Sequence, residues 1–297
     1  MSIKRGPVAS LLFICWLASG QRRDLYVDAT LPSLEARVFA SGVVSISRGE
    51  GNYEERPVFS PDFRECYFDV SNYKAKTFTS FSMHHENGRW TKPEPAFFAK
   101  YGGFQASIAP GGHRLFFVAP KPDDAKNRGV WMVERKSGAW TNPVLLDSPV
   151  NSQPSVGFPC VTNSNTLYFL SMTGTGKGVY RSKLEDNAYR SIEKLDLLPP
   201  GSQYIVGDVY VAPDESYIVF YSNLPDNLGK GDLYVAFQRP DGLWTEPRNP
   251  GKAVNTPDYD FAPSISPDGK YLFFTRDAGG GEGDIYWVRA KVVSGLR

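Results

Sequence analysis

The sequence predicts an all-β fold, a β-propeller of five four-stranded blades. Three observations predict it: a motif that recurs about every 50 residues, four short β-rich runs in each repeat, and no helical periodicity along the chain. Repeats of this length built from strands are typical of propeller blades. An apolar content of 41%, with 14% aromatic residues, can supply one large hydrophobic core.

The recurring motif is an aromatic one. Segments such as ECYF, RLFF and YLFF end at Phe68, Phe117, Phe169, Phe220 and Phe274, which are 49, 52, 51 and 54 residues apart. A second series follows at Phe81, Trp131, Tyr180, Tyr234 and Tyr286, and a third at Trp90, Trp140, Tyr189 and Trp244. We expect the first two series to be buried in the second and third strands of each blade, where they form the core.

Turn residues separate the first and second runs of each repeat. Pro61, Pro110, Pro213 and Pro267 begin short turns rich in Asp and Gly, and residues 163–165 replace that turn in the third repeat. Proline presets its own backbone angle, and Asp or Gly tolerates the corner that follows. Each repeat therefore reads as two antiparallel hairpins.

The last repeat, from Tyr259 to Val293, supplies only three runs. We expect a strand at residues 37–39 to complete it as the outermost strand, because an unclosed ring would leave a free sheet edge. Six blades are the alternative, but a hidden sixth blade would have to fit into residues 22–50, which are too few.

The beginning of the chain predicts export. Lys4 and Arg5 precede an apolar run that ends in small residues, which is the pattern of a secretory signal peptide over residues 1–20. Residues 21–36 would be an N-terminal extension, and 37–297 a single propeller domain. We expect a periplasmic or secreted monomer with no transmembrane segment. The bulky Ile14 before Cys15 disfavours lipoprotein anchoring.

The net charge and the cysteines bear on the partners and on the disulfide bonds to be expected. The formal net charge of +1 argues against nucleic acid as a partner. Cys66 occupies a core position of the first repeat and Cys160 belongs to the third, so we expect two free thiols.

Two segments of the sequence resemble the repeat of a known family. SISPDGKYLFFTRD and GDIYWVRA are similar to the WD40-like β-propeller repeat with a Pro-Asp signature, the repeat of TolB-like propellers. The resemblance runs from Val38 to Val293. It implies a protein of the bacterial envelope whose propeller docks proteins or small ligands, and it implies no fixed catalytic residues.

Candidate binding residues lie in the linkers that lead into each repeat, because propellers usually bind at the mouth of the central channel. They are acids, amides and tyrosines, which suit a sugar, a peptide or a cation: Glu54, Glu55, Tyr101, Gln105, Gln153, Tyr204, Asp208, Asp258, Tyr259 and Asp260. The same groups would also suit hydrogen bonds between adjacent blades.

The functional hypothesis is a non-enzymatic docking module that binds a protein or a glycan of the cell envelope at one propeller face. A scaffold protein without a small-molecule site is a further hypothesis. The enzymatic alternative is a carbohydrate-active hydrolase or lyase, in which Glu54 or Glu55 would work with Asp208 or Asp260 across roughly 5 to 10 Å. We expect no cofactor and no metal, because the adjacent His84 and His85 would point to opposite sides of a strand.

Overall fold

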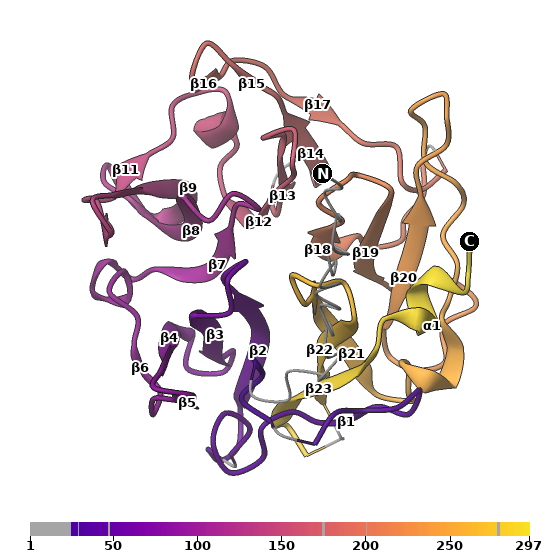
Figure 1. Cartoon of the computed structure of the whole chain (residues 1–297). Coiled ribbons are helices and arrows are strands. Elements are labelled where there is room, and N and C mark those ends of the chain that lie inside the picture. The colour runs from indigo at the N-terminus through magenta and orange to yellow at the C-terminus, as the bar shows by residue number, and fades with distance from the viewer. Residues whose placement is uncertain (1–24, 29, 47, 174–175, 200, 278–279) are drawn as a thin grey trace, which may run out of the picture.

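The computed structural model describes residues 25–28, 30–46, 48–173, 176–199, 201–277 and 280–297, so the expected signal peptide at 1–20 lies outside the described residues. The fold is nearly all β and of the propeller type (Figure 1). Within the described ranges the one α-helix is a single turn, α1 (Lys291–Ser294). The described part of the chain contains no helix that is long and apolar enough to cross a bilayer.

Three-stranded antiparallel groups follow one another along the chain. We call them units 1 to 5: β2 (Asn52–Phe59), β3 (Glu65–Asn72) and β4 (Thr77–Glu86); β7 (Phe104–Ile108), β8 (Arg114–Lys121) and β9 (Asp124–Lys136); β12 (Val156–Val161), β13 (Leu167–Ser171) and β14 (Gly178–Ser182); β18 (Gly207–Val211), β19 (Tyr217–Ser222) and β20 (Asp232–Phe237); β21 (Tyr259–Ile265), β22 (Tyr271–Asp277) and β23 (Gly283–Arg289). The units surround a common centre, and the first strand of each lies nearest to it (Figure 1).

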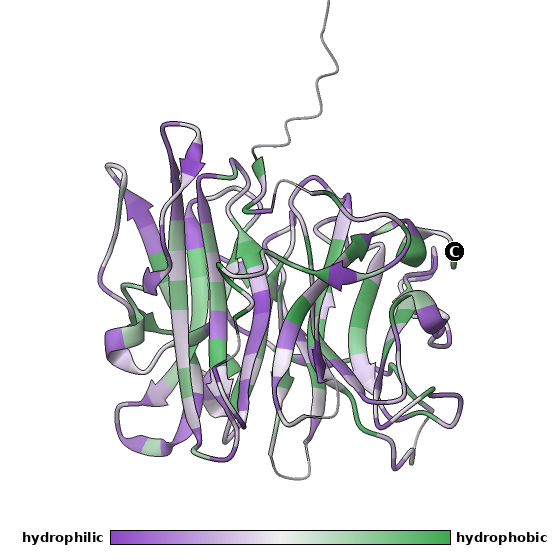
Figure 2. Cartoon of the chain, turned by 90° about the horizontal axis from the view of Figure 1, so that it is seen from below, coloured by the Kyte–Doolittle hydropathy of each residue, from purple (hydrophilic) through white to green (hydrophobic). Residues whose placement is uncertain are grey.

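Short outer segments flank the third strands. They are β5 (Arg89–Trp90), β6 (Glu94–Pro95), β10 (Ala139–Trp140), β11 (Val144–Leu145), β15 (Leu184–Glu185), β16 (Ala188–Tyr189) and β17 (Glu193–Lys194), with 3-10 turns at η2 (Ala99–Tyr101), η3 (Val150–Ser152) and η4 (Gly251–Ala253). In unit 4 the outer contacts are two isolated bridges, Val235 to Arg248 and Gln238 to Trp244. Seen from the side, the strands run across the thickness of the molecule and many of the connecting loops are hydrophilic (Figure 2).

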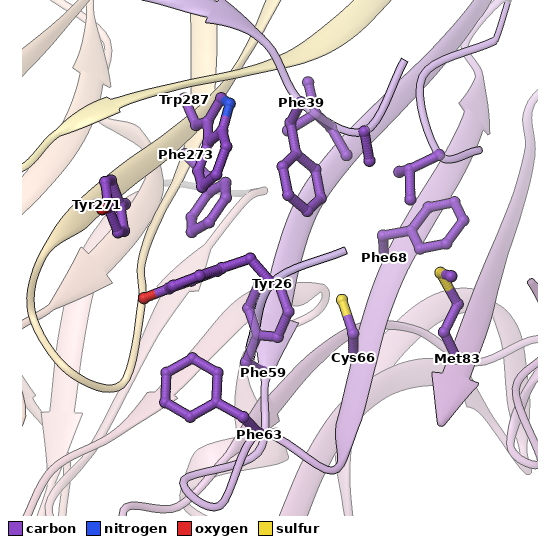
Figure 3. Close-up of a cluster of buried hydrophobic side chains, with 13 residues drawn as sticks. Tyr26, Phe39, Phe59, Phe63, Cys66, Phe68, Met83, Tyr271, Phe273 and Trp287 are labelled. Atoms are coloured by element: carbon purple, nitrogen blue, oxygen red, sulfur yellow. The ribbon is translucent and has the colours of Figure 1, made fainter. Parts of the chain in front are cut away.

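The N-terminal strand β1 (Arg37–Val38) pairs antiparallel with β23 of unit 5, Arg37 opposite Trp287. Phe39 follows and is fully buried, with ring centroids 5.0 Å from Phe273 and 5.2 Å from Trp287 (Figure 3). Tyr26 packs edge-on against the same cluster and donates a 2.7 Å hydrogen bond to Asp268. Segments from the two ends of the chain therefore share one aromatic core.

The aromatic repeats pair across strands at equivalent positions. Each residue of the first series is opposite the matching residue of the second, as Phe68 is opposite Phe81 and Phe274 is opposite Tyr286. All five residues of the first series are at most 1% exposed. In the second series Tyr180 and Tyr234 are buried and the other three residues are half-buried.

Both predicted free thiols, Cys66 and Cys160, are buried and unpaired.

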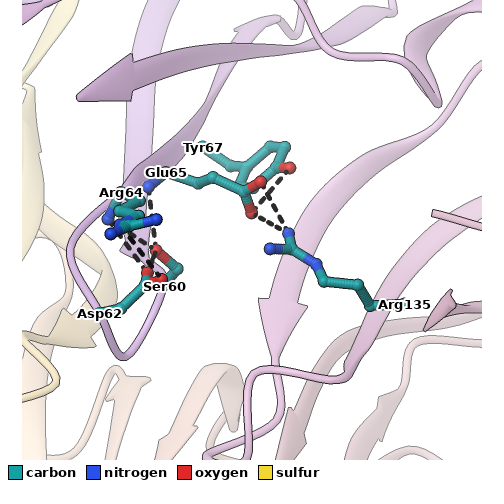
Figure 4. Close-up of polar contacts among 6 residues, drawn as sticks. All are labelled: Ser60, Asp62, Arg64, Glu65, Tyr67 and Arg135. Carbon is teal, nitrogen blue, oxygen red and sulfur yellow. Dashed lines mark hydrogen bonds and ion pairs between the residues drawn. The ribbon is translucent and has the colours of Figure 1, made fainter. Parts of the chain in front are cut away.

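Polar contacts also join neighbouring units. Arg135 of unit 2 donates to both carboxylate oxygens of Glu65 in unit 1, at 2.7 Å each (Figure 4). Both hydrogen bonds come from Nη2 of Arg135, so this charged pair links the two units through a single nitrogen.

Candidate functional site

Every inner strand contains a β-bulge at the same place. The bulged residue has a positive φ between 45° and 55° although it is not glycine, and it stands five residues before the turn position of its unit: Arg56, Gln105, Phe158, Asp208 and Ala262. Positive φ is uncommon outside glycine and is held in place only by its surroundings. Bulges of this kind redirect side chains next to binding sites.

Side chains of one unit hold the bulge of the next. The Gln105 amide donates to Asp69 of unit 1 at 2.9 Å, and the Phe158 amide donates to the Gln105 side chain at 2.9 Å. The Ala262 amide donates to Asp208 of unit 4 at 3.2 Å. These contacts satisfy backbone groups that the bulges remove from the strand ladder.

Two cavities lie at opposite ends of the inner strands. The wide cavity, about 980 Å³, is lined by residues of all five units, including the first residues of the inner strands. The narrow cavity, about 360 Å³, is lined by the last residues of the same strands and by the turn prolines Pro61, Pro110, Pro213 and Pro267. The bulges lie between the two.

Glu55 of β2 lines the wide cavity although its side chain is 2% exposed. Burial, reinforced by the charges of Asp208 and Asp69, raises the pKa of Glu55 to about 8. The Tyr73 hydroxyl donates to Glu55 Oε1 at 2.7 Å. The Glu55 carboxyl is therefore mostly protonated at neutral pH, with its second oxygen not engaged by Tyr73.

Asp208 of β18 lines the same cavity from unit 4 and is half-buried. Desolvation raises the pKa of Asp208 to about 6, against the lowering effects of the Ala262 amide and the charge of Arg56. Asp208 is therefore mostly ionised at pH 7, where Glu55 is mostly protonated. The wide cavity thus brings together an acid and a base.

Asp69 and Arg56 complete the charged group behind the cavity. Asp69 is buried, accepts hydrogen bonds from Ser80 and the Gln105 amide, and has its pKa raised to about 6 by burial. Arg56 is 3% exposed, donates to the Pro159 carbonyl at 3.1 Å and packs against the Phe158 ring. Its positive charge favours the ionised forms of both Asp69 and Asp208.

Aromatic rings form one wall of the wide cavity. They contact one another in a row, with centroid distances from 5.0 to 5.9 Å: Phe261, Tyr53, Tyr73, Phe78 and Phe104. Leu195, Leu197 and Ile205 line the cavity from the segment that follows β17. Apolar walls with a few convergent polar groups are the usual composition of a small-molecule site.

The structure brings half of the predicted site residues to the wide cavity. These are Glu55, Gln105, Tyr204, Asp208 and Tyr259. Gln105 and Asp208 also make hydrogen bonds between units, which is the alternative that the sequence left open for these residues.

The other five predicted residues lie away from the cavity lining, and three of them are in ion pairs. Glu54 pairs with Arg48 at 2.7 Å, Asp258 with Lys230 at 3.0 Å, and Asp260 with Arg276 at 2.8 Å.

The remaining two are Tyr101 and Gln153. Tyr101 is 45% exposed beside Lys100. The Gln153 side chain accepts from Ser171 at 3.3 Å, and its carbonyl accepts from Lys121. Side chains alternate along a strand, so only Glu55 of the adjacent pair Glu54–Glu55 reaches the wide cavity.

Several residues of the site lie outside the linkers, where the sequence placed all of the candidate binding residues. Tyr73 directly follows β3, Phe78 is the second residue of β4 and Arg128 lies within β9, whereas Asp69, which contacts the site without lining the cavity, directly follows the aromatic motif at Phe68. A usable signal exists for the bulges, namely the constant spacing of five residues before the turn position. Among the residues that the structure describes, no group of three or more His, Cys, Asp or Glu could hold a metal.

No protein-family model matches the chain, and no curated protein matches it. Among solved structures it is similar to the GH43 protein BlXynB from Bacillus licheniformis, with 12% identity, a TM-score of 0.52, and coverage of 87% of this chain and 57% of that one. A gluconolactonase from Xanthomonas campestris matches with 12% identity, a TM-score of 0.47, and coverage of 86% and 95%. Regucalcin from Agrobacterium tumefaciens, a calcium-binding protein, matches with 14% identity, a TM-score of 0.46, and coverage of 81% and 91%.

This chain spans little more than half the length of the GH43 protein, and at such identities the likeness establishes the propeller fold alone. Two of the similar structures with a TM-score of 0.50 or more are forms of this GH43 protein, which is a hydrolase and not a docking module. The prediction of a non-enzymatic docking module, and with it the expectation that the chain is not an enzyme, is therefore corrected.

Proposed function

We propose that this protein is a carbohydrate-active hydrolase or lyase whose active site is the wide cavity. One observation carries the proposal: acidic residues from units 1 and 4, Glu55 and Asp208, line the same cavity and have pKa values of about 8 and about 6. A pair of carboxyls whose environments separate their pKa values is the arrangement that acid–base cleavage of a glycosidic bond requires.

In this proposal Glu55 is the general acid. Protonated at neutral pH, it gives its proton to the oxygen of the leaving sugar as the glycosidic bond breaks. Tyr73 holds the carboxyl in place through Oε1 at 2.7 Å. Because Tyr73 donates to Oε1, the proton is best carried by Oε2.

Asp208 is the base. As a carboxylate it accepts a proton, either from an attacking water in hydrolysis or from a sugar carbon in elimination. Asp69 and Arg56 touch no substrate and act as positioning residues. Asp69 holds the bulge amide of Gln105 and adds negative charge that keeps Glu55 protonated, while Arg56 keeps Asp208 ionised.

The aromatic wall supports a sugar ligand in particular. Sugar rings present flat apolar faces edged with hydroxyls, and the row from Phe261 to Phe104 offers apolar surface beside polar groups. The partner is then a glycan and not a nucleic acid.

The proposal extends to architecture and location. The five units are the blades of one propeller, with β1 as the outermost strand of the last blade, and the repeats are of the WD40-like, TolB-like type. The chain is a single domain over 37–297, preceded by an extension at 21–36 and a signal peptide at 1–20. It works as a monomer that is exported to the periplasm or secreted.

Turnover of a panel of plant and bacterial glycans tests the proposal. Glu55→Gln and Asp208→Asn should each lower kcat at least 100-fold, since general acid–base catalysis contributes that much, while ligand binding is kept. Asp196→Asn is the matched control, because Asp196 lines the same cavity but is exposed. Absence of turnover in the wild-type protein, or unchanged kcat in both variants, would overturn the proposal.

A further inference from the structure

The wide cavity is lined by an arginine that forms no ion pair with any carboxylate of the described residues. Arg128 of β9 lines the cavity and is half-buried. Its guanidinium lies 4.4 Å from the Phe78 ring centroid and 4.6 Å from that of Phe104. Among the described residues it has no ion-pair or hydrogen-bond partner for its side chain.

The two phenylalanines form a rigid support for this group. Their rings stack on each other at 5.0 Å, and the guanidinium packs over both. Arginine tolerates such stacking because its planar group is weakly hydrated, and stacking leaves the N–H groups at its edge free to donate. That edge can hold a carboxylate through two parallel hydrogen bonds.

Positively and negatively charged side chains line different sides of the wide cavity. Arg128, Lys177 and Lys194 line it from units 2 and 3, whereas Glu55, Asp208 and Asp277 line it from units 1, 4 and 5. Asp196 is the one acid on the cationic side, and it is exposed. A ligand that carries a negative group is therefore attracted to units 2 and 3, with its neutral part toward the acids.

Resting on the proposed function, we infer that the substrate is an acidic glycan, and that Arg128 binds the carboxylate of a uronic acid residue next to the bond that is cleaved. Tyr73 connects the two parts of the site, because it donates to Glu55 and its ring is 5.7 Å from Phe78. A sugar bound at Arg128 is thus connected to the general acid, Glu55, through the contact between the Phe78 and Tyr73 rings.

The test compares uronic-acid oligosaccharides with the same oligosaccharides after reduction of their carboxyls to alcohols. The wild-type protein should favour the acidic set by about 10- to 100-fold in kcat/KM, the range expected for hydrogen bonds to a charged group. Arg128→Gln should remove that preference by lowering kcat/KM on the acidic set by about 10- to 100-fold, to the level of the neutral set. Arg128→Lys, which keeps charge but loses the planar fork, should fall between. Arg64→Gln, at an exposed surface position, is the control.

Binding distinguishes failure of this inference from failure of the proposed function. The probe is the acidic oligosaccharide titrated into Glu55→Gln by calorimetry, with and without Arg128→Gln. Affinity that depends on Arg128 without any turnover in the wild type would support the carboxylate site and refute the enzyme. Equal turnover of acidic and neutral sets, unchanged in Arg128→Gln, would refute the carboxylate site and leave the enzyme standing.

Discussion

At the scale of single residues, Glu55 shows how a ring of strands changes the chemistry of a side chain. In the unfolded chain this carboxyl has an ordinary pKa, and in the fold burial raises that pKa to about 8. The folded protein therefore binds a proton between about pH 5 and 8 that the unfolded chain releases. Stability from this residue is fully present at low pH and is lost as the pH rises through the folded pKa.

We expect Glu55→Gln to become more stable relative to the wild type as the pH rises. The neutral amide does not ionise, so the difference in the free energy of unfolding should grow by up to about 1.4 kcal/mol per pH unit between pH 5 and 8. Urea unfolding at pH 5 and pH 9 measures it, with the exposed Glu94→Gln as control. A difference that stays constant with pH would show that Glu55 is not protonated in the fold.

At the scale of the strand, the sequence predicted the repeated aromatic strands but not the properties that depend on contacts between different units. The aromatic spacing predicted the second and third strands of each unit, because Phe68 and Phe274 stand at equivalent core positions. The pKa values of Glu55 and Asp208 depend on which units face one another, and no local pattern contains that information. Tyr73 and Arg128 were not predicted for the same reason, since they line the cavity from different units.

The first aromatic series should carry much of the stability. Phe117 is fully buried and its ring stacks on Phe98 at 4.7 Å. Phe117→Ala should lower the free energy of unfolding by about 3 to 5 kcal/mol, from lost burial and the cavity that remains. Leu243→Ala, at a 58% exposed position, should change it by less than about 0.5 kcal/mol. Similar melting temperatures for both variants would contradict the assignment of the core.

At the scale of the whole molecule, the site exists only if unit 1 and unit 4 are held around one centre. The pairing of β1 with β23 and the aromatic cluster around Phe39 join the two ends of the chain at unit 5, next to unit 1. Loss of this junction should loosen the ring and the cavity together.

Phe39→Ala tests that junction. Phe39 is fully buried among Phe59, Phe273 and Trp287, so we expect a loss of about 3 to 5 kcal/mol in the free energy of unfolding. Leu34→Ala, at a 50% exposed position nearby in sequence, is the control. Hydrogen exchange should show faster opening of β23 in Phe39→Ala, and unchanged exchange there would mean that the N-terminal strand does not hold the last unit.

The central claim is that Glu55 and Asp208 form one acid–base pair, and the pH dependence of kcat/KM on a cleaved glycan tests it most directly. The account predicts a bell-shaped profile for the pair, rising with an apparent pKa near 6 as Asp208 ionises and falling with one near 8 as Glu55 loses its proton. A profile that stays flat from pH 5 to pH 9 would contradict it.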